Sequence, residues 1–250
     1  MYLSEKHQYF KDGVQYISVT TLRDSWFKKF DPDETLRKMR LKPMVKYEGM
    51  TDEEIKQEWT LKGEIASSKG TLLHKHIEHF YKMESVTDDS VEYAQFMAFV
   101  QDSSLVPYEI EWMVGDSDTR IAGTIDFVAQ NKDGTIDLYD WKRSSKVNEY
   151  VPFYGHCLEI ELCHIPDTTY WKYTIQLNLY KYLVEKMGKR VRHMYLVCFH
   201  PDILNYQRYQ VANVDLGKIL NRTRKGTHVP LDTAMDPTMD KSMVDKKSGV

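Results

Sequence analysis

The chain has 250 residues, of which 42% are hydrophobic and 28% are charged, values that suit a soluble globular protein with one large domain or two small ones. Its formal net charge of −3 argues against binding nucleic acid by bulk electrostatics alone, although a local basic groove is compatible with it. The N-terminus lacks the apolar core of a secretory signal, no apolar run approaches a membrane span, and 3 cysteines are too few for a disulfide framework. We therefore expect an intracellular protein without membrane contact. Cytoplasm, nucleus and virus-infected cell all stay open, as does the oligomeric state.

Residues 1–100 are predicted to be mostly helical. Ser18 offers a helix cap, Pro32 begins a second helix with acids in its first turn, and Thr51 opens a near capping box for a third. Another helix, carrying residues 72–81, is predicted to follow the Ser-Ser-Lys-Gly-Thr segment at 67–71. A further helix is predicted at about residues 90–100.

From residue 107 onward the pattern changes to strands. We predict strands at 107–114, 120–130 and 135–142, an irregular segment at 144–169, a helix at 170–187, and strands at 191–199 and 206–214. The order helix, three strands, helix, strand indicates a mixed α/β (α+β) layered domain, with a mixed sheet flanked by helices. We divide the chain into a helical N-terminal portion (1–66), a core (67–215) and a partly disordered tail (216–250).

The most informative residues lie on two neighbouring strands. Asp133-Gly134 between two β-rich runs predicts a hairpin, so Asp126 and Asp140 come from adjacent antiparallel strands. Side chains alternate along a strand, so Asp140 and Lys142 share one face. Two carboxylates beside a lysine can hold a hard divalent cation next to a fixed positive charge, which suits phosphodiester cleavage. The alternative is that these are ordinary solvated residues at strand ends.

Two further groups are candidate metal ligands. His74 and Glu78 are four residues apart on a predicted helix and share a face, where they are either ligands or an exposed pair. Alternation places Glu109 and Glu111 on the face opposite Ile110 and Trp112. Either glutamate could be solvent-facing, and we favour Glu111 as the one that approaches a metal.

The chemistry of these residues indicates which ion they would bind. Mg²⁺ prefers carboxylate and water oxygens, and an imidazole ligand such as His74 would also suit Mn²⁺. The backbone carbonyl of Trp141 could complete one corner of the site. Lys142 would position or deprotonate water or stabilise developing negative charge, unless it only forms a salt bridge to Asp126.

Gln176 and Tyr180 are four residues apart on the helix predicted at 170–187. They could simply pack on this largely apolar helix. Alternatively, the amide of Gln176 could bind the lysine, a phosphate or a base, while Tyr180 stacks.

Together these motifs resemble the PD-(D/E)XK nuclease superfamily, in particular its RecB-like exonuclease branch and relatives encoded by phages and large DNA viruses. The resemblance runs from about residue 17 to about residue 213 and includes the Ser-Val-Thr-Thr-Leu opening at 18–22. Its matching elements, in chain order, are Gly70-Thr71-x-x-His74-x-x-x-Glu78, Glu111, Gly123-x-x-Asp126, Asp140-Trp141-Lys142 and Gln176-Leu177-x-x-Tyr180.

The resemblance implies a metal-dependent nuclease with an αβββαβ, restriction-endonuclease-like core. His74, Asp126 and Asp140 would bind Mg²⁺ or Mn²⁺, one or two ions, Lys142 would be catalytic, and Gln176 with Tyr180 would form the helix motif of this branch. The chain departs from the common pattern at Asp140, where glutamate is more frequent, and at Arg143, where a small hydroxyl residue is frequent. Its 3 scattered cysteines do not match the four of the iron–sulfur members, so no cluster is expected.

Three hypotheses about function follow. The leading one is a deoxyribonuclease that degrades DNA from ends or as single strands in recombination, repair or genome processing, with the helical N-terminal portion helping to form a passage for the strand. A second keeps the site but makes the protein an endonuclease of structured DNA or RNA. The third is a nucleic-acid-binding module without catalytic activity.

Overall fold

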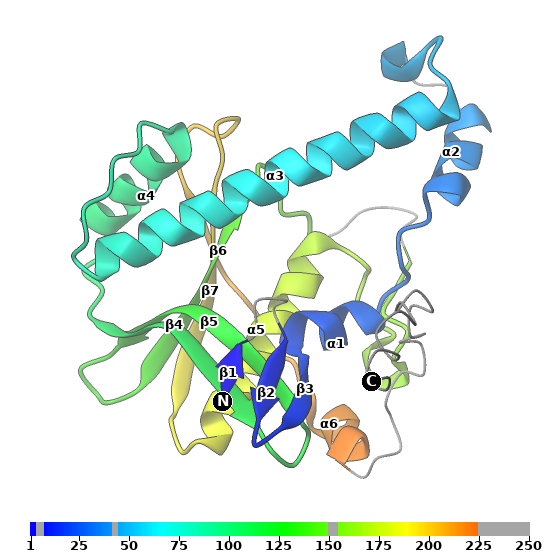
Figure 1. The fold of residues 1–250 in the computed structure, drawn as a ribbon. Coiled ribbons are helices and arrows are strands. Elements are labelled where there is room, and N and C mark those ends of the chain that lie inside the picture. Colours follow the sequence, from blue (N-terminus) through cyan, green and yellow to red (C-terminus); the bar gives the residue numbers. More distant parts are fainter. Residues whose placement is uncertain (4–7, 42–44, 150–154, 225–250) are drawn as a thin grey trace, which may run out of the picture.

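The computed structural model describes residues 1–3, 8–41, 45–149 and 155–224, which fold into a mixed sheet flanked by helices (Figure 1). The strands are β1 Tyr2–Leu3, β2 Tyr9–Lys11, β3 Val14–Ser18, β4 Pro107–Asp116, β5 Ile121–Gln130, β6 Ile136–Arg143, β7 Val191–Phe199 and β8 Gln207–Gln210. The helices are α1 Val19–Ser25, α2 Pro32–Leu41, α3 Asp52–Tyr81, α4 Val91–Asp102, α5 Thr169–Lys186 and α6 Gly217–Arg224, with short 3-10 helices η1 Val45–Tyr47 and η2 Ile160–Leu162.

The strand order is β1-β2-β3-β5-β6-β7-β8, and β4 pairs with β5 along the other edge of that strand. β3 pairs with β5 in parallel at Ile121 and Ala122, whereas β6 pairs with it in antiparallel fashion from Phe127 onward. The sheet therefore opens between β3 and β6, alongside the segment of β5 that carries residues 123–126. Because β6 continues to Arg143 by pairing with β7, this opening is bordered by ordered backbone.

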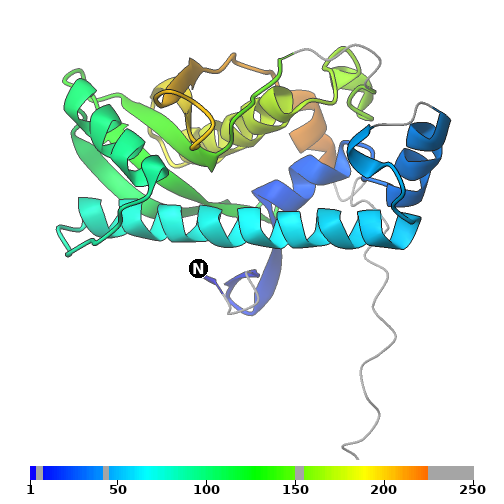
Figure 2. The ribbon, with the colours of Figure 1, turned by 90° about the horizontal axis from the view of Figure 1, so that it is seen from above.

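Two hydrophobic clusters cover the two faces of the sheet. The main cluster joins the sheet to α1, α5 and α6 and contains Leu22, Ile175 and Ile219. The second, here called the aromatic cluster, joins the sheet to α3 and α4 and consists of Leu73, Ile77, Phe96, Phe99, Phe127, Ala129, Tyr139, Trp141, Val197 and Phe199. Figure 2 shows α3 along one side of the molecule, with α4 at one end of it and α2 at the other.

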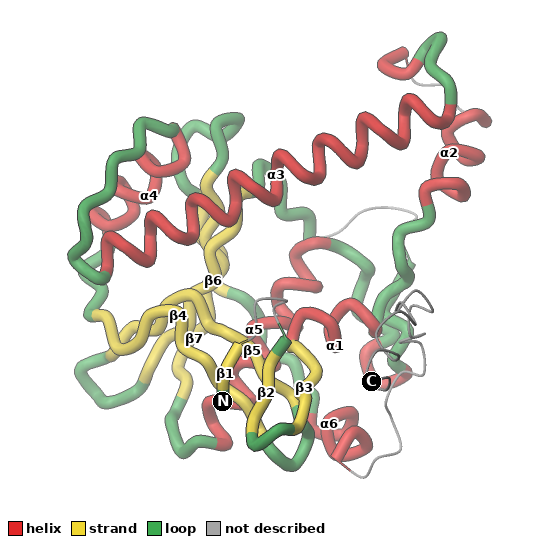
Figure 3. The backbone as a smooth tube through the Cα atoms, viewed as in Figure 1, coloured by secondary structure: helices red, strands yellow, loops and turns green. Residues whose placement is uncertain are grey.

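The predicted fold class is confirmed, because helices flank a mixed sheet. The predicted order of a helix, three strands, a helix and a further strand is present as α4, β4, β5, β6, α5 and β7. The predicted hairpin forms between β5 and β6, with Gly134 at φ 80° and Asp133 accepting hydrogen bonds from the backbone and hydroxyl of Thr135. Ser18 and Thr51 cap α1 and α3 as expected. Figure 3 displays these helices around the strands.

One expectation about the N-terminal portion is wrong. Residues 52–81 form one helix, α3, rather than two, because internal Ser and Gly lower helix propensity by about 1 kcal/mol or less each and packing at both ends of the helix outweighs that cost. Residues 1–100 are mostly helical as predicted, and residues 2–18 add the strands β1, β2 and β3, which the sequence patterns did not indicate. The division at residues 66 and 215 stays a prediction, and the tail from residue 225 lies outside the described residues. In the part of the chain described, no helix combines the length and apolarity that crossing a bilayer requires.

Candidate active site

Strand β6 presents Asp140 and Lys142 on the same face, toward α5, as alternation predicts. Lys142 Nζ lies 2.6 Å from Asp140 Oδ2, and Gln176 Nε2 donates to Asp140 Oδ1 at 2.7 Å. The salt bridge of Lys142 is therefore to Asp140 rather than to Asp126. Burial raises the pKa of Asp140, while attraction to Lys142 opposes that rise. Burial also disfavours the charge of Lys142, but the carboxylates of Asp140 and Asp126 outweigh it and raise the lysine pKa.

The backbone of Trp141 forms hydrogen bonds with two further candidate metal ligands, His74 and Asp126. Trp141 N donates to Asp126 Oδ2 at 2.7 Å, and Trp141 O accepts from His74 Nε2 at 2.8 Å. A carbonyl can only accept, so Nε2 carries the hydrogen and Nδ1 faces Asp126 Oδ1 at 3.7 Å. Two acceptors at that spacing repel each other unless a proton or a shared cation lies between them.

Glu111 stands opposite Asp126 on the paired strand β4. The flanking register pairs are Ile110 with Phe127 and Trp112 with Ile125. Glu111 has φ 49°, a left-handed conformation that is strained for a side chain other than glycine. Such an outlier in the middle of a strand is typical of a functional site, where surrounding packing holds it in place.

Both strands change faces at this pair. Ile110 and Phe127 pack in the aromatic cluster, whereas Trp112 and Ile125 pack with the main cluster on the other face. The expectation that Ile110 and Trp112 share a face is therefore wrong. The alternation of side chains along β4 is interrupted where the backbone turns at Glu111. Alternation therefore does not predict the face on which Glu111 lies.

His74, Glu111 and Asp126 bring one ligand atom each to within 4.8 Å of one another. Burial, followed by repulsion from Asp126 and Glu78, raises the pKa of Glu111 to about 8. A nitrogen and two carboxylates, beside the carbonyl of Trp141, form a donor set that fits Mg²⁺ or Mn²⁺. Glu78 borders the same cleft, where it forms an ion pair with Lys82.

Tyr180 packs against Gly123, three residues before Asp126. A Cβ at Gly123 would lie 2.6 Å from Tyr180 Cε1 and 3.1 Å from Val19 Cγ2, so only glycine allows the strand and α5 to approach this closely. Burial raises the pKa of Tyr180 well above its usual value, so the phenol stays neutral. The spacing Gly123-x-x-Asp126 thus places the metal candidate beside a close strand–helix contact.

Sequence reasoning missed three residues of the site. Arg23 donates to Gln176 Oε1, and the ring centroid of Tyr173 lies 5.2 Å from Lys142 Nζ. Tyr9 hydrogen-bonds Thr124 at 3.0 Å. Burial, together with the negative charges of Glu111 and Asp126, raises the pKa of its phenol. The three- and seven-residue spacings from Tyr173 to Gln176 and Tyr180 could have identified Tyr173 as a member of their helix face. Arg23 and Tyr9 reach the site only through tertiary contacts.

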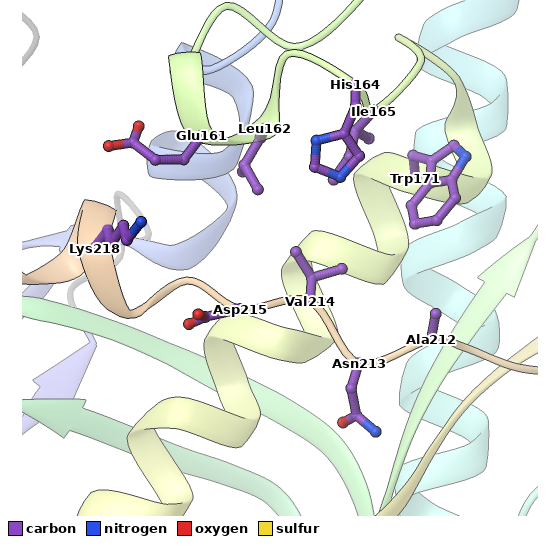
Figure 4. Close-up of a pocket in the computed structure, with 10 residues that line it drawn as sticks. All are labelled: Glu161, Leu162, His164, Ile165, Trp171, Ala212, Asn213, Val214, Asp215 and Lys218. Carbon is purple, nitrogen blue, oxygen red and sulfur yellow. The ribbon is translucent and has the colours of Figure 1, made fainter.

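A cleft of about 660 Å³ gives access to this site. It is lined by Ala66, Ser67, Gly70, Thr71, His74, Lys75, Glu78 and His79 of α3, together with Glu111, Lys142 and Arg143. A second pocket, of about 390 Å³, lies between the η2 region, the start of α5 and α6 (Figure 4). Its walls include Leu162, Trp171 and Val214 and contain none of the predicted site residues.

No protein-family model and no curated protein matches this chain. Among solved structures, the alkaline exonuclease LHK-Exo from Laribacter hongkongensis is similar over 85% of each chain, at 10% identity and a TM-score of 0.44. A candidate exonuclease from Eubacterium rectale is similar over 72% of this chain and 77% of its own, at 10% identity and a TM-score of 0.39. The protein SSO0001 is similar over 54% of this chain, which spans 57% of SSO0001, at 18% identity and a TM-score of 0.30.

Proposed function

We propose that this protein is a metal-dependent deoxyribonuclease that hydrolyses phosphodiester bonds, acting from DNA ends or on single strands. The observation that carries the proposal is the convergence of His74, Glu111 and Asp126 beside the buried Asp140–Lys142 pair. These groups come from α3 and from three neighbouring strands and meet at the opening of the sheet. A surface cluster of solvated charges would have no reason to combine strained backbone, burial and a salt-bridged lysine.

The ligands of the ion would be His74, Glu111, Asp126 and the carbonyl of Trp141, with Asp140 adjacent to them. Carboxylate, carbonyl and imidazole donors suit Mg²⁺ or Mn²⁺, and we propose one or two such ions. When bound, the ion would lower the pKa of a water, orient the phosphate and neutralise charge on it. Burial, followed by repulsion from Asp126 and Glu78, raises the pKa of Glu111, and a bound cation would offset both effects, which supports this assignment.

Lys142 would act in its protonated form. Its pKa is raised by Asp140 and Asp126, so the ammonium group keeps its proton at neutral pH. It can therefore donate hydrogen bonds to a phosphate oxygen or to the attacking water, and it can stabilise negative charge as the phosphate is attacked. Asp140, held by Gln176, fixes where that ammonium group points.

The cleft beside α3 offers room for the DNA backbone, with Lys75 and Arg143 on its walls. Beyond the cleft, the N-terminal half of α3 and α2 form an arm that projects from the sheet (Figure 1). Phe30, two residues before α2, is 69% exposed, and its ring lies edge-on to that of Trp59 on the arm, with 5.8 Å between the centroids. We propose that the arm guides a single strand, because exposed rings and lysines can stack bases and hold phosphates.

The test is to incubate the purified protein with 5′-labelled and 3′-labelled DNA, single- and double-stranded, in Mg²⁺, Mn²⁺ or EDTA. Lys142→Ala and Asp126→Asn are expected to abolish cleavage. Lys186→Ala, which removes a surface lysine paired with Asp118, is the control and should cleave like the wild type. Each variant is first checked for folding by circular dichroism.

The label pattern gives the polarity, and a circular single strand separates the two nuclease hypotheses because an exonuclease that needs an end leaves it intact. Cleavage of RNA alone would change the substrate class. Tight DNA binding with no metal-dependent cleavage of any substrate would overturn the proposal in favour of a binding module.

A further inference from the structure

We infer that Arg23 is a positioning residue of this site, acting through Gln176 to hold Asp140 and Lys142 in place; the inference rests on the proposed nuclease function. Arg23 lies on α1 and its side chain is 13% exposed. Its guanidinium donates to Gln176 Oε1, and Gln176 Nε2 donates to Asp140 Oδ1 at 2.7 Å. Asp140 Oδ2 then faces Lys142 Nζ at 2.6 Å.

The order of donors and acceptors along this chain admits one arrangement. A guanidinium and an ammonium group only donate, an ionised carboxylate only accepts, and an amide does one at each end. Arg23 therefore fixes the oxygen of Gln176 toward α1, which leaves its nitrogen for Asp140. An amide turned the other way would face Asp140 with an oxygen and Arg23 with an NH₂ group, and both contacts would be repulsive.

Arg23 is itself held from the other side. Its Nε and Nη2 atoms donate to Asp24 Oδ1 at 2.8 and 2.7 Å, so the guanidinium is anchored while Nη1 reaches Gln176. Asp24 is more than half exposed, which places the outer end of the chain at the surface of α1. Burial raises the pKa of Tyr173 and Tyr180 on α5, and the charge of Arg23 opposes that rise in both.

This network explains how α1 takes part in a site built on β6 and α5. In a buried, low-dielectric setting each hydrogen bond polarises the next, and the whole set behaves as one unit. Loss of Arg23 would leave the oxygen of Gln176 without its donor and let the amide and Asp140 sample other rotamers. The ammonium group of Lys142 would then be misplaced, which lowers turnover and leaves substrate binding unchanged.

A double-mutant cycle tests the inference, using Arg23→Met, Gln176→Met and the double variant, with kcat and KM measured at saturating Mg²⁺. We expect Arg23→Met to lower kcat about tenfold with KM within about twofold, and to have an effect below about twofold once Gln176 is replaced. Arg23→Lys, which restores a donor, should recover part of the loss. Arg192→Met, which breaks an arginine–aspartate contact with Asp137, is the control.

The inference would be overturned if the losses of kcat in the two single variants multiply in the double variant, because Arg23 would then act independently of Gln176. A rise in KM without a fall in kcat would also overturn it, because Arg23 would then act on the substrate directly. Equal kcat for wild type and Arg23→Met would overturn it as well. The proposed function is judged separately, by cleavage in the wild type and its loss in Lys142→Ala. Circular dichroism and melting curves identify a variant that fails to fold, in which case Arg23→Gln takes the place of Arg23→Met.

Discussion

The two sides of strand β6 are built on opposite principles, although their residues alternate along one stretch of chain. Tyr139 and Trp141 point into the aromatic cluster, where both are almost fully buried among rings from α4 and β7. Asp140 and Lys142 point to the other side, where they form a buried ion pair against α5. The first side supplies stability through apolar burial, and the second holds charges whose desolvation costs stability. Trp141 joins them, because its ring is anchored in one side while its backbone binds His74 and Asp126.

The largest effect is expected on the aromatic side. Phe96 is fully buried and makes edge contacts with Phe80, Trp141 and Phe199 at ring-centroid distances of 5.3, 6.3 and 6.0 Å. Phe96→Ala should lower the free energy of unfolding by about 3–5 kcal/mol, because it leaves a cavity in a packed cluster. Denaturant titration measures this, and Phe30→Ala, which truncates an exposed ring, is the control. Equal losses in the two variants would mean that the aromatic cluster is not the stabilising side.

For the Asp140–Lys142 pair, replacing both residues is expected to cost less stability than replacing either one. Asp140→Asn or Lys142→Met alone should cost about 3 kcal/mol, because each leaves a buried charge without its partner. The double variant should return to within about 1 kcal/mol of the wild type, since neither charge of the pair is left without its partner. Denaturant titration of all four proteins checks this, and all three variants should lack nuclease activity. If the two losses simply add, the pair is not coupled as its 2.6 Å contact indicates.

Glu111 lets the stability cost of burying a charge at this site be measured as a function of pH. Its pKa is raised from 4.5 to about 8, so the folded protein keeps a proton that the unfolded chain releases above about pH 4.5. The stability of the metal-free wild type should therefore fall as pH rises from about 4.5 to about 8. Glu111→Gln has no such proton, so its stability advantage should be absent near pH 4.5 and grow to about a few kcal/mol at pH 8, since each pKa unit corresponds to about 1.4 kcal/mol.

Melting curves in EDTA across this pH range measure the difference. Addition of Mg²⁺ should raise the melting temperature of the wild type more than that of Glu111→Gln, since the variant lacks a metal ligand. A stability difference that does not change with pH would show that Glu111 is ionised in the metal-free fold.

Local patterns predicted the parts of this protein that depend on local physics. The Asp133-Gly134 turn, the shared face of Asp140 and Lys142, and the capped helices follow from turn chemistry and periodicity, and the fold class follows from their order. The left-handed backbone at Glu111 could not be predicted, because packing on both faces of the sheet imposes it against local preference. Arg23 was missed because 153 residues separate it from Gln176.

The smallest effect is expected at two glycines of α3, the helix that carries His74. Gly63 and Gly70 both lie inside this helix, and a Cβ at either position would have no atom within 4 Å. Replacing either by alanine should stabilise the protein by about 0.5–1 kcal/mol, because alanine has the higher helix propensity. Only Gly70 lines the cleft, so only Gly70→Ala should raise KM for DNA if the backbone of the substrate passes close to α3. Steady-state kinetics of the two variants compare them directly. Unchanged KM in both, with the expected gain in stability, would place the path of the DNA away from this face of α3.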